Sequence, residues 1–128
     1  MGKKILIVDD EAHIRILLEQ TLEDLEAYVE GLVVLQADNG REALEIIQKE
    51  LPDMVILDVM MPEMNGFEVC DIVKNKLKLA GVYIVMLTAK GQEFDRIKGI
   101  ESGADVYMTK PFDPDAMVHE AKKVFGIK

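Results

Sequence analysis

Four of the short apolar runs in this sequence lead to residues whose side chains can do chemistry. Ile5–Val8 is followed by Asp9 and Asp10, and later runs lead to Asp58, Thr88 and Lys110. Carboxylates without accompanying His or Cys select a hard cation such as Mg²⁺, which would also offset their mutual repulsion. A hydroxyl and an ammonium can donate to an oxyanion, and an aspartate can act as a nucleophile that forms an acyl phosphate. These residue types together indicate metal-assisted phosphoryl transfer.

Each of these residues has a more ordinary interpretation when it is taken alone. An aspartate after a strand most often caps a helix or forms a turn, and Lys110-Pro111 would usually be a loop. The constellation is more specific, because four strand ends carry groups that suit one reaction. Ligands of open parallel sheets bind beyond the carboxyl ends of the strands, so we expect the four ends to meet at one rim.

The elements that must position these residues are visible as alternating patterns. Five apolar, β-branched runs predict strands at Ile5–Val8, Leu32–Leu35, Met54–Leu57, Val82–Leu87 and Val106–Met108. Their continuous apolar character indicates strands that are covered on both faces, as in a parallel sheet. Apolar residues at helical spacing lie between and after them, within residues 14–25, 43–47, 67–77, 94–104 and 117–125. We therefore predict an α/β fold in which helices cover both faces of a five-stranded parallel sheet, with residues 1–128 forming a single domain.

Local signals mark several helix boundaries. Asn39-Gly40 and Asn65-Gly66 precede the second and third helices, Asp113-Pro114 opens the last helix, and Gly126 stands where a C-cap belongs. The stretch Glu23–Gly31 remains open, because it could extend the first helix by about a turn or form a mobile loop.

Composition excludes several classes of protein. The 15 basic and 24 acidic residues give a net charge of −9, which disfavours direct binding to nucleic acid or to an anionic membrane. Cys70 is the single cysteine, so no internal disulfide can form, and we expect a buried thiol in a reducing, cytoplasmic setting. The apolar runs are too short for a membrane span or a signal peptide.

The order of these motifs closely resembles the receiver domain of response regulators in bacterial two-component systems. The resemblance covers nearly the whole chain. It is carried by the stretches Ile5–Glu11, Asp58–Gly66, Thr88–Lys90 and Gly103–Phe112. It implies a flavodoxin-like, chemotaxis-regulator-like fold with strand order 2-1-3-4-5. It also implies a phosphorylation-switched signalling module rather than a metabolic enzyme, one that catalyses its own phosphorylation and dephosphorylation.

The resemblance assigns roles around the nucleophile and the metal. Asp58 matches the phosphoacceptor, which receives its phosphoryl group from a sensor histidine kinase or a phosphotransfer protein. Asp9 and Asp10 match the acidic pair that binds Mg²⁺ with Asp58, and Met60 matches the position that gives the metal a backbone carbonyl. Asn65 stands where the family more often has Asp, and we expect it to cap the following helix all the same.

The resemblance also assigns a switch and a partner surface. Thr88 matches the hydroxyl that moves to the phosphoryl group, Lys110 the lysine that pairs with it, and Tyr107 the aromatic residue that turns inward on activation. In this family the Lys–Pro bond is typically cis. The downstream partner would bind the face made by the fourth helix, fifth strand and fifth helix, to which Lys98, Ile100, Val106, Tyr107 and Lys122 could contribute.

Three rival functions fit the sequence less well. A small-molecule phosphohydrolase of the aspartate-nucleophile type would need a second Asp two positions after Asp58, where Met60 stands. A flavodoxin would need a phosphate-binding loop after the first strand, where Asp9 and Asp10 would repel a phosphate. A phosphorylation-independent interaction domain would not need the complete set of acidic and basic groups. We expect the protein to act by binding a partner, or as part of a longer regulator.

Overall fold

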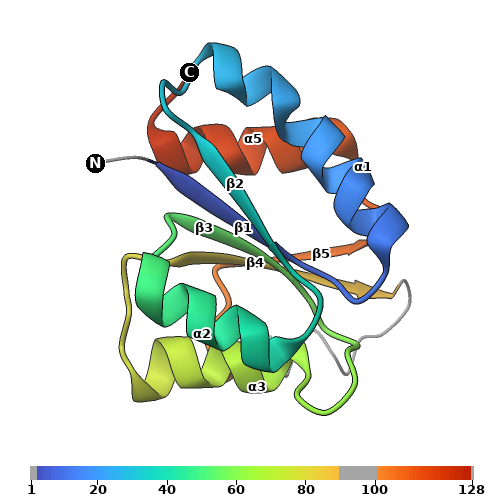
Figure 1. The fold of residues 1–128 in the computed structure, drawn as a ribbon, viewed down its shortest axis with the longest axis vertical. Helices are drawn as coiled ribbons and strands as arrows, with labels where there is room; N and C mark the ends of the chain where they lie inside the picture. The colour runs from blue at the N-terminus through green and yellow to red at the C-terminus, as the bar shows by residue number, and fades with distance from the viewer. Residues whose placement is uncertain (1–2, 90–100, 128) are drawn as a thin grey trace.

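The computed structural model describes residues 3–89 and 101–127 of the chain. Its strands are β1 (Lys4–Val8), β2 (Val33–Ala37), β3 (Met54–Asp58), β4 (Tyr83–Ala89) and β5 (Val106–Lys110). They form one parallel sheet in the order β2-β1-β3-β4-β5, which confirms the predicted fold class and strand order. Every strand therefore points its carboxyl end toward the same edge of the sheet (Figure 1).

Helices cover both faces of the sheet (Figure 1). One face carries α1 (Ala12–Leu22) and α5 (Pro114–Phe125), and the other carries α2 (Gly40–Glu50) and α3 (Gly66–Asp71). Most of the helix expected within residues 94–104 lies outside the described residues. Within the described residues, no helix is long and apolar enough to cross a membrane.

The central strands are apolar throughout because each of their faces meets a separate core. On β1, Leu6 and Val8 pack in the cluster beneath α2 and α3, whereas Ile5 and Ile7 pack in the cluster beneath α1 and α5. Alternate residues of a strand point to opposite faces, so a strand with helices over both faces has apolar residues at every position. Complete burial of one such side chain contributes about 1.5–3 kcal/mol to the stability of the fold. The buried strands therefore hold the residues at their carboxyl ends in place.

The capping residues stand where the sequence placed them. Asn39 and Asn65 accept hydrogen bonds from the third residue of α2 and α3, and Asn65 forms a full capping box with Glu68. Asp113 caps α5 ahead of a proline in the first turn, and Gly126 ends that helix with a φ of 69°. These are local interactions between near neighbours in sequence, which is why the pattern alone located them.

Two segments take tighter or wider helical turns than the pattern indicated. Glu23–Ala27 continues α1 as a 3-10 helix, which resolves the stretch that the sequence left open. Leu25 and Val29 are buried there, so the segment is held by its apolar residues. After α3, Ile72–Lys76 forms a π-helical turn in which the Leu77 N–H donates to the Ile72 carbonyl, five residues back.

Candidate active site

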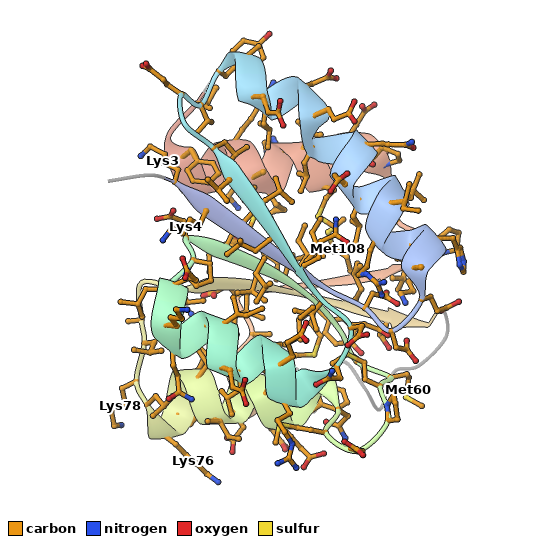
Figure 2. All side chains as sticks on the ribbon, viewed as in Figure 1. Lys3, Lys4, Met60, Lys76, Lys78 and Met108 are labelled. Atoms are coloured by element: carbon orange, nitrogen blue, oxygen red, sulfur yellow. The ribbon has the colours of Figure 1, made fainter. Side chains whose placement is uncertain are left out.

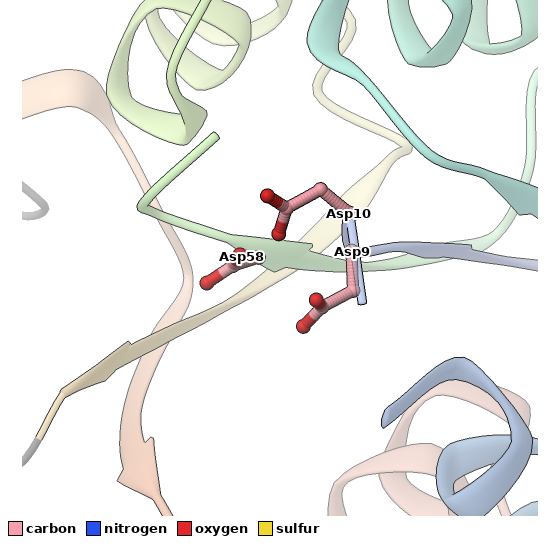
Figure 3. Close-up of side chains that lie close together, drawn as sticks. All are labelled: Asp9, Asp10 and Asp58. Atoms are coloured by element: carbon pink, nitrogen blue, oxygen red, sulfur yellow. The ribbon is translucent and has the colours of Figure 1, made fainter. Parts of the chain in front are cut away.

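The carboxyl ends of β1 and β3 place three aspartates together. Asp9 and Asp10 follow the last residue of β1, and Asp58 is the last residue of β3. One carboxylate oxygen from each lies within 4.8 Å of the others, and Figure 3 shows the three groups gathered beyond the strand ends. Asp9 and Asp58 are buried, at 0% and 3% exposure, whereas Asp10 is exposed.

Hydrogen bonds fix Asp9 on all sides. Its Oδ1 accepts from the Glu11 N–H at 2.9 Å, and its Oδ2 accepts from Lys110 Nζ at 2.8 Å. Its backbone N–H donates to the Ala37 carbonyl of β2, and its carbonyl accepts from Arg15 Nη1 at 2.7 Å. A buried carboxylate needs such partners, because an unpaired one would suffer a large desolvation penalty. Asp9 is therefore a rigid part of the rim.

Lys110 is the cation that faces this acidic group. Its Nζ lies 2.8 Å from Asp9 Oδ2 and 3.1 Å from Asp58 Oδ1, with the side chain 21% exposed. Burial by itself lowers the pKa of Lys110, but the hydrogen bonds to Asp9 and Asp58 outweigh burial and raise that pKa above its usual value. The side chain is therefore charged at neutral pH, and the β4–β5 pairing of Ala89 with Lys110 brings it to the rim.

The Lys110 ammonium does not fully compensate the negative charge of the carboxylates. Burial and the negative charge of Asp9 raise the pKa of Asp58 to about 6, although Lys110 and the Met60 backbone N–H pull it down. An Asp58 that is ionised at neutral pH therefore lies in a site that still carries excess negative charge. The donor set is all oxygen, with Asp10 accessible to solvent, and it suits a hard divalent cation.

The loop after β3 brings backbone close to Asp58. The Gly66 N–H donates to the Val59 carbonyl at 2.9 Å, and a Cβ at Gly66 would collide with the Asp58 carbonyl oxygen. The Met60 side chain is 67% exposed. Figure 2 shows it at the end of the molecule opposite Lys3 and Lys4, so it lies at the carboxyl ends of the strands. A thioether is a soft ligand that suits Mg²⁺ poorly, so any contribution of Met60 to such a cation would come from its backbone carbonyl.

Thr88 and Tyr107 lie on the neighbouring strands. Thr88 is 1% exposed and follows Leu87, which pairs with Asp58. Tyr107 of β5 pairs with Met86 of β4; its ring packs against the core beneath α2 and α3, and its hydroxyl is buried.

Comparison with known proteins gives this rim its context. The family model of the response regulator receiver domain matches residues 5–122. The chain belongs to the receiver-domain family of response regulators. The alkaline phosphatase synthesis transcriptional regulatory protein PhoP of Bacillus subtilis (strain 168) is 47% identical over 114 residues, covering 89% of this chain and 45% of PhoP. The receiver domain thus spans about half the length of the curated relatives it matches.

Solved structures agree with this assignment. A putative response regulator from Chloroflexus aurantiacus has a TM-score of 0.85 and 36% identity, covering 98% of this receiver domain and 99% of that chain. The chemotaxis response regulator CheY4 of Vibrio cholerae has a TM-score of 0.81 and 35% identity, with 97% and 99% coverage. These likenesses confirm the family that the sequence motifs indicated.

The structure of the receiver domain brings together most of the residues singled out from the sequence. Asp9, Asp10, Asp58 and Lys110 form one cluster, and the Lys110–Pro111 bond is cis, as the family resemblance implied. On the expected partner face, Lys98 and Ile100 lie outside the described residues. Lys122 lies 5.5 Å from the centroid of the Tyr28 ring, so it packs toward the 3-10 segment after α1.

Sequence reasoning missed two contacts at the rim. It matched Lys110 to the lysine that pairs with the phosphoryl group and named no contact with Asp9, whereas the lysine bonds both Asp58 and Asp9, with the shorter distance to Asp9. It gave no role to Arg15, which reaches the Asp9 carbonyl from α1. The sequence shows only that Arg15 is a basic residue a few positions after the acidic pair. Many surface helices carry such a residue, so this pattern did not identify the contact.

Proposed function

We propose that this receiver domain accepts a phosphoryl group on Asp58 and that Lys110 and Thr88 stabilise the product. The observation that supports this most strongly is the buried Asp58 carboxylate between Lys110, at 3.1 Å, and the acidic pair. An Asp58 oxygen would attack the phosphorus while the bond from phosphorus to the donor breaks. A histidine kinase or phosphotransfer protein would supply the group as phosphohistidine, whose nitrogen leaves with the bonding electrons.

Asp9, Asp10 and Asp58, with the backbone carbonyl of Met60, would hold Mg²⁺. A bound Mg²⁺ neutralises charge on the transferring phosphoryl oxygens and orients them. Asp9 is held by Lys110 and the Glu11 N–H, so we infer that the exposed Asp10 is the more adaptable ligand. The Met60 backbone N–H lowers the pKa of Asp58, so it favours the ionised carboxylate that would bind a cation.

The new phosphoryl group would then change the protein beyond the site. Thr88 would move toward it and Tyr107 would follow, which shifts a pre-existing two-state equilibrium. We assign residues 1–128 to this one domain and place it in the cytoplasm. Its signal would pass to a protein partner through the face made by the fourth helix, β5 and α5, rather than by direct contact with nucleic acid or membrane.

Incubation with acetyl phosphate and Mg²⁺, followed by intact mass measurement, tests this proposal. We expect one added phosphoryl group, which is absent without Mg²⁺ and absent in Asp58→Asn, because an amide is a poor nucleophile. Asp53→Asn is the matched control. Asp53 lies immediately before the first residue of β3, at the end of the strand far from the site, and its carboxylate accepts a hydrogen bond from the Lys4 N–H. Undiminished phosphorylation of Asp58→Asn would refute the assignment.

A further inference from the structure

Arg15 makes an unusual contact for a surface-helix arginine. It lies in the first half of α1, and its Nη1 donates to the backbone carbonyl of Asp9 at 2.7 Å. Its side chain is half-buried, although Ile16 and Leu17 beside it are exposed. A guanidinium directed at a main-chain oxygen forms a charge-assisted hydrogen bond, which is stronger than a neutral one.

The carbonyl that Arg15 holds belongs to the peptide unit between Asp9 and Asp10. Because the peptide unit is planar, fixing its oxygen limits rotation of that plane about the Cα atoms on either side. The direction in which the Asp10 side chain leaves the backbone depends on the same rotation. The other three bonds of Asp9 hold its N–H and its carboxylate, so Arg15 restrains the side of the residue that leads to Asp10.

We propose that Arg15 is a positioning residue for the metal site: by holding the Asp9–Asp10 peptide plane it directs the Asp10 carboxylate toward Asp58. This inference rests on the proposed Mg²⁺ site. Asp10 is exposed, and in the described part of the chain its side chain has no hydrogen-bond or ion-pair partner of its own. Its placement within 4.8 Å of the other two carboxylates therefore depends on the backbone beneath it.

The charge of Arg15 gives the test a clear sign. A positive side chain near the three carboxylates opposes the binding of a metal cation to them. If Arg15 acted by charge alone, removing it would tighten Mg²⁺ binding. If it positions Asp10, removing it weakens Mg²⁺ binding in spite of the lost repulsion.

Calorimetric titration of the unphosphorylated protein with Mg²⁺ separates these outcomes. We expect Arg15→Met, which keeps an unbranched chain of similar bulk, to raise the Kd about fivefold, equivalent to about 1 kcal/mol. Arg15→Lys keeps the charge but lacks the rigid planar fork, so we expect a smaller rise of about twofold. An unchanged or lower Kd in Arg15→Met would overturn the proposal.

Glu19→Gln is the matched control on the same helix. Glu19 accepts a hydrogen bond from Gln36 of β2, so this change weakens another link between α1 and the sheet edge without touching Asp9. We expect its Kd for Mg²⁺ to equal that of the wild type. An equal rise in Glu19→Gln and Arg15→Met would mean that general loosening of α1 explains the result.

A metal-free measurement keeps this inference separate from the proposed function. The Glu11 N–H donates to Asp9 Oδ1 at 2.9 Å, so its hydrogen exchange reports on the order of this turn. We expect Arg15→Met, but not Glu19→Gln, to speed exchange at Glu11 in EDTA, with exchange in β3 unchanged. Failure of the wild type to bind Mg²⁺ would refute the metal site, whereas unchanged Glu11 exchange in Arg15→Met would refute the role of Arg15.

Discussion

Replacing Asp58 by Asn should stabilise the metal-free protein, and the gain should depend on pH. Burial and the charge of Asp9 raise the pKa of Asp58 to about 6, above its ordinary value of 3.8. Between these two pH values the folded protein binds more protons than the unfolded chain. The free energy of unfolding therefore falls as pH rises through this window, and the full penalty is present above about pH 6.

The size of the effect follows from the same two values. A rise in pKa from 3.8 to about 6 corresponds to roughly 3 kcal/mol of destabilisation by the ionised form. Water at the open rim screens part of this, so we expect about 2 kcal/mol. The uncharged amide introduced by Asp58→Asn escapes the penalty at every pH. The stability difference between variant and wild type should therefore grow by about 2 kcal/mol from near pH 4 to above pH 7.

Urea unfolding in EDTA at several pH values measures this difference, with Asp53→Asn as the control for the loss of one charge from an acidic protein. Excess Mg²⁺ should remove most of the gain, because an ion that binds the folded wild type stabilises it. A gain that does not vary with pH, or a loss of stability above pH 7, would show that Asp58 is not destabilised by its surroundings.

Three further changes probe the rest of the rim. Asp10→Ala should weaken Mg²⁺ binding about tenfold or more in calorimetry while leaving stability in EDTA level or slightly raised; a large loss would mark Asp10 as a structural cap. Lys110→Ala should still accept some phosphoryl group but transmit little to Tyr107; beryllofluoride-induced NMR shifts as extensive as those of the wild type would exclude Lys110 as the coupling residue. Gly66→Ala should destabilise the protein by about 2 kcal/mol or more in urea, because its Cβ meets the Asp58 carbonyl, whereas Gly81→Ala has open space and should be neutral.

The sequence was most informative where one residue and its near neighbours decide the outcome. The caps at Asn39, Asn65 and Asp113 are such cases. The central strands are another, because burial on both faces makes their sequences continuously apolar. Strand ends were less exact: β5 continues to Lys110, two residues beyond the apolar run, because polar residues at the rim still pair with β4.

Contacts between distant segments could not be predicted in this way. The π-helical turn after α3 adjoins the segment before β5, where Asn75 Nδ2 bonds the Glu101 and Ser102 carbonyls and Lys74 pairs with Asp105 at 2.7 Å. Arg15 binds a backbone oxygen, which every residue possesses, so no pattern of side chains reveals the pairing. The order of the rim residues did reveal the site, because carboxylates, hydroxyl and ammonium each follow an apolar strand.

The strand order has a consequence for how the chain folds. β1 lies between β2 and β3, so residues 4–58 already contain three paired strands, and β5 can join only through β4. During synthesis the N-terminal part folds first. Asp9 and Asp58 can thus come together before Lys110 has left the ribosome. The nascent half-domain would hold two crowded carboxylates without their ammonium, so we expect it to stay loosely packed until the last strand docks and completes both the sheet and the charge balance of its rim.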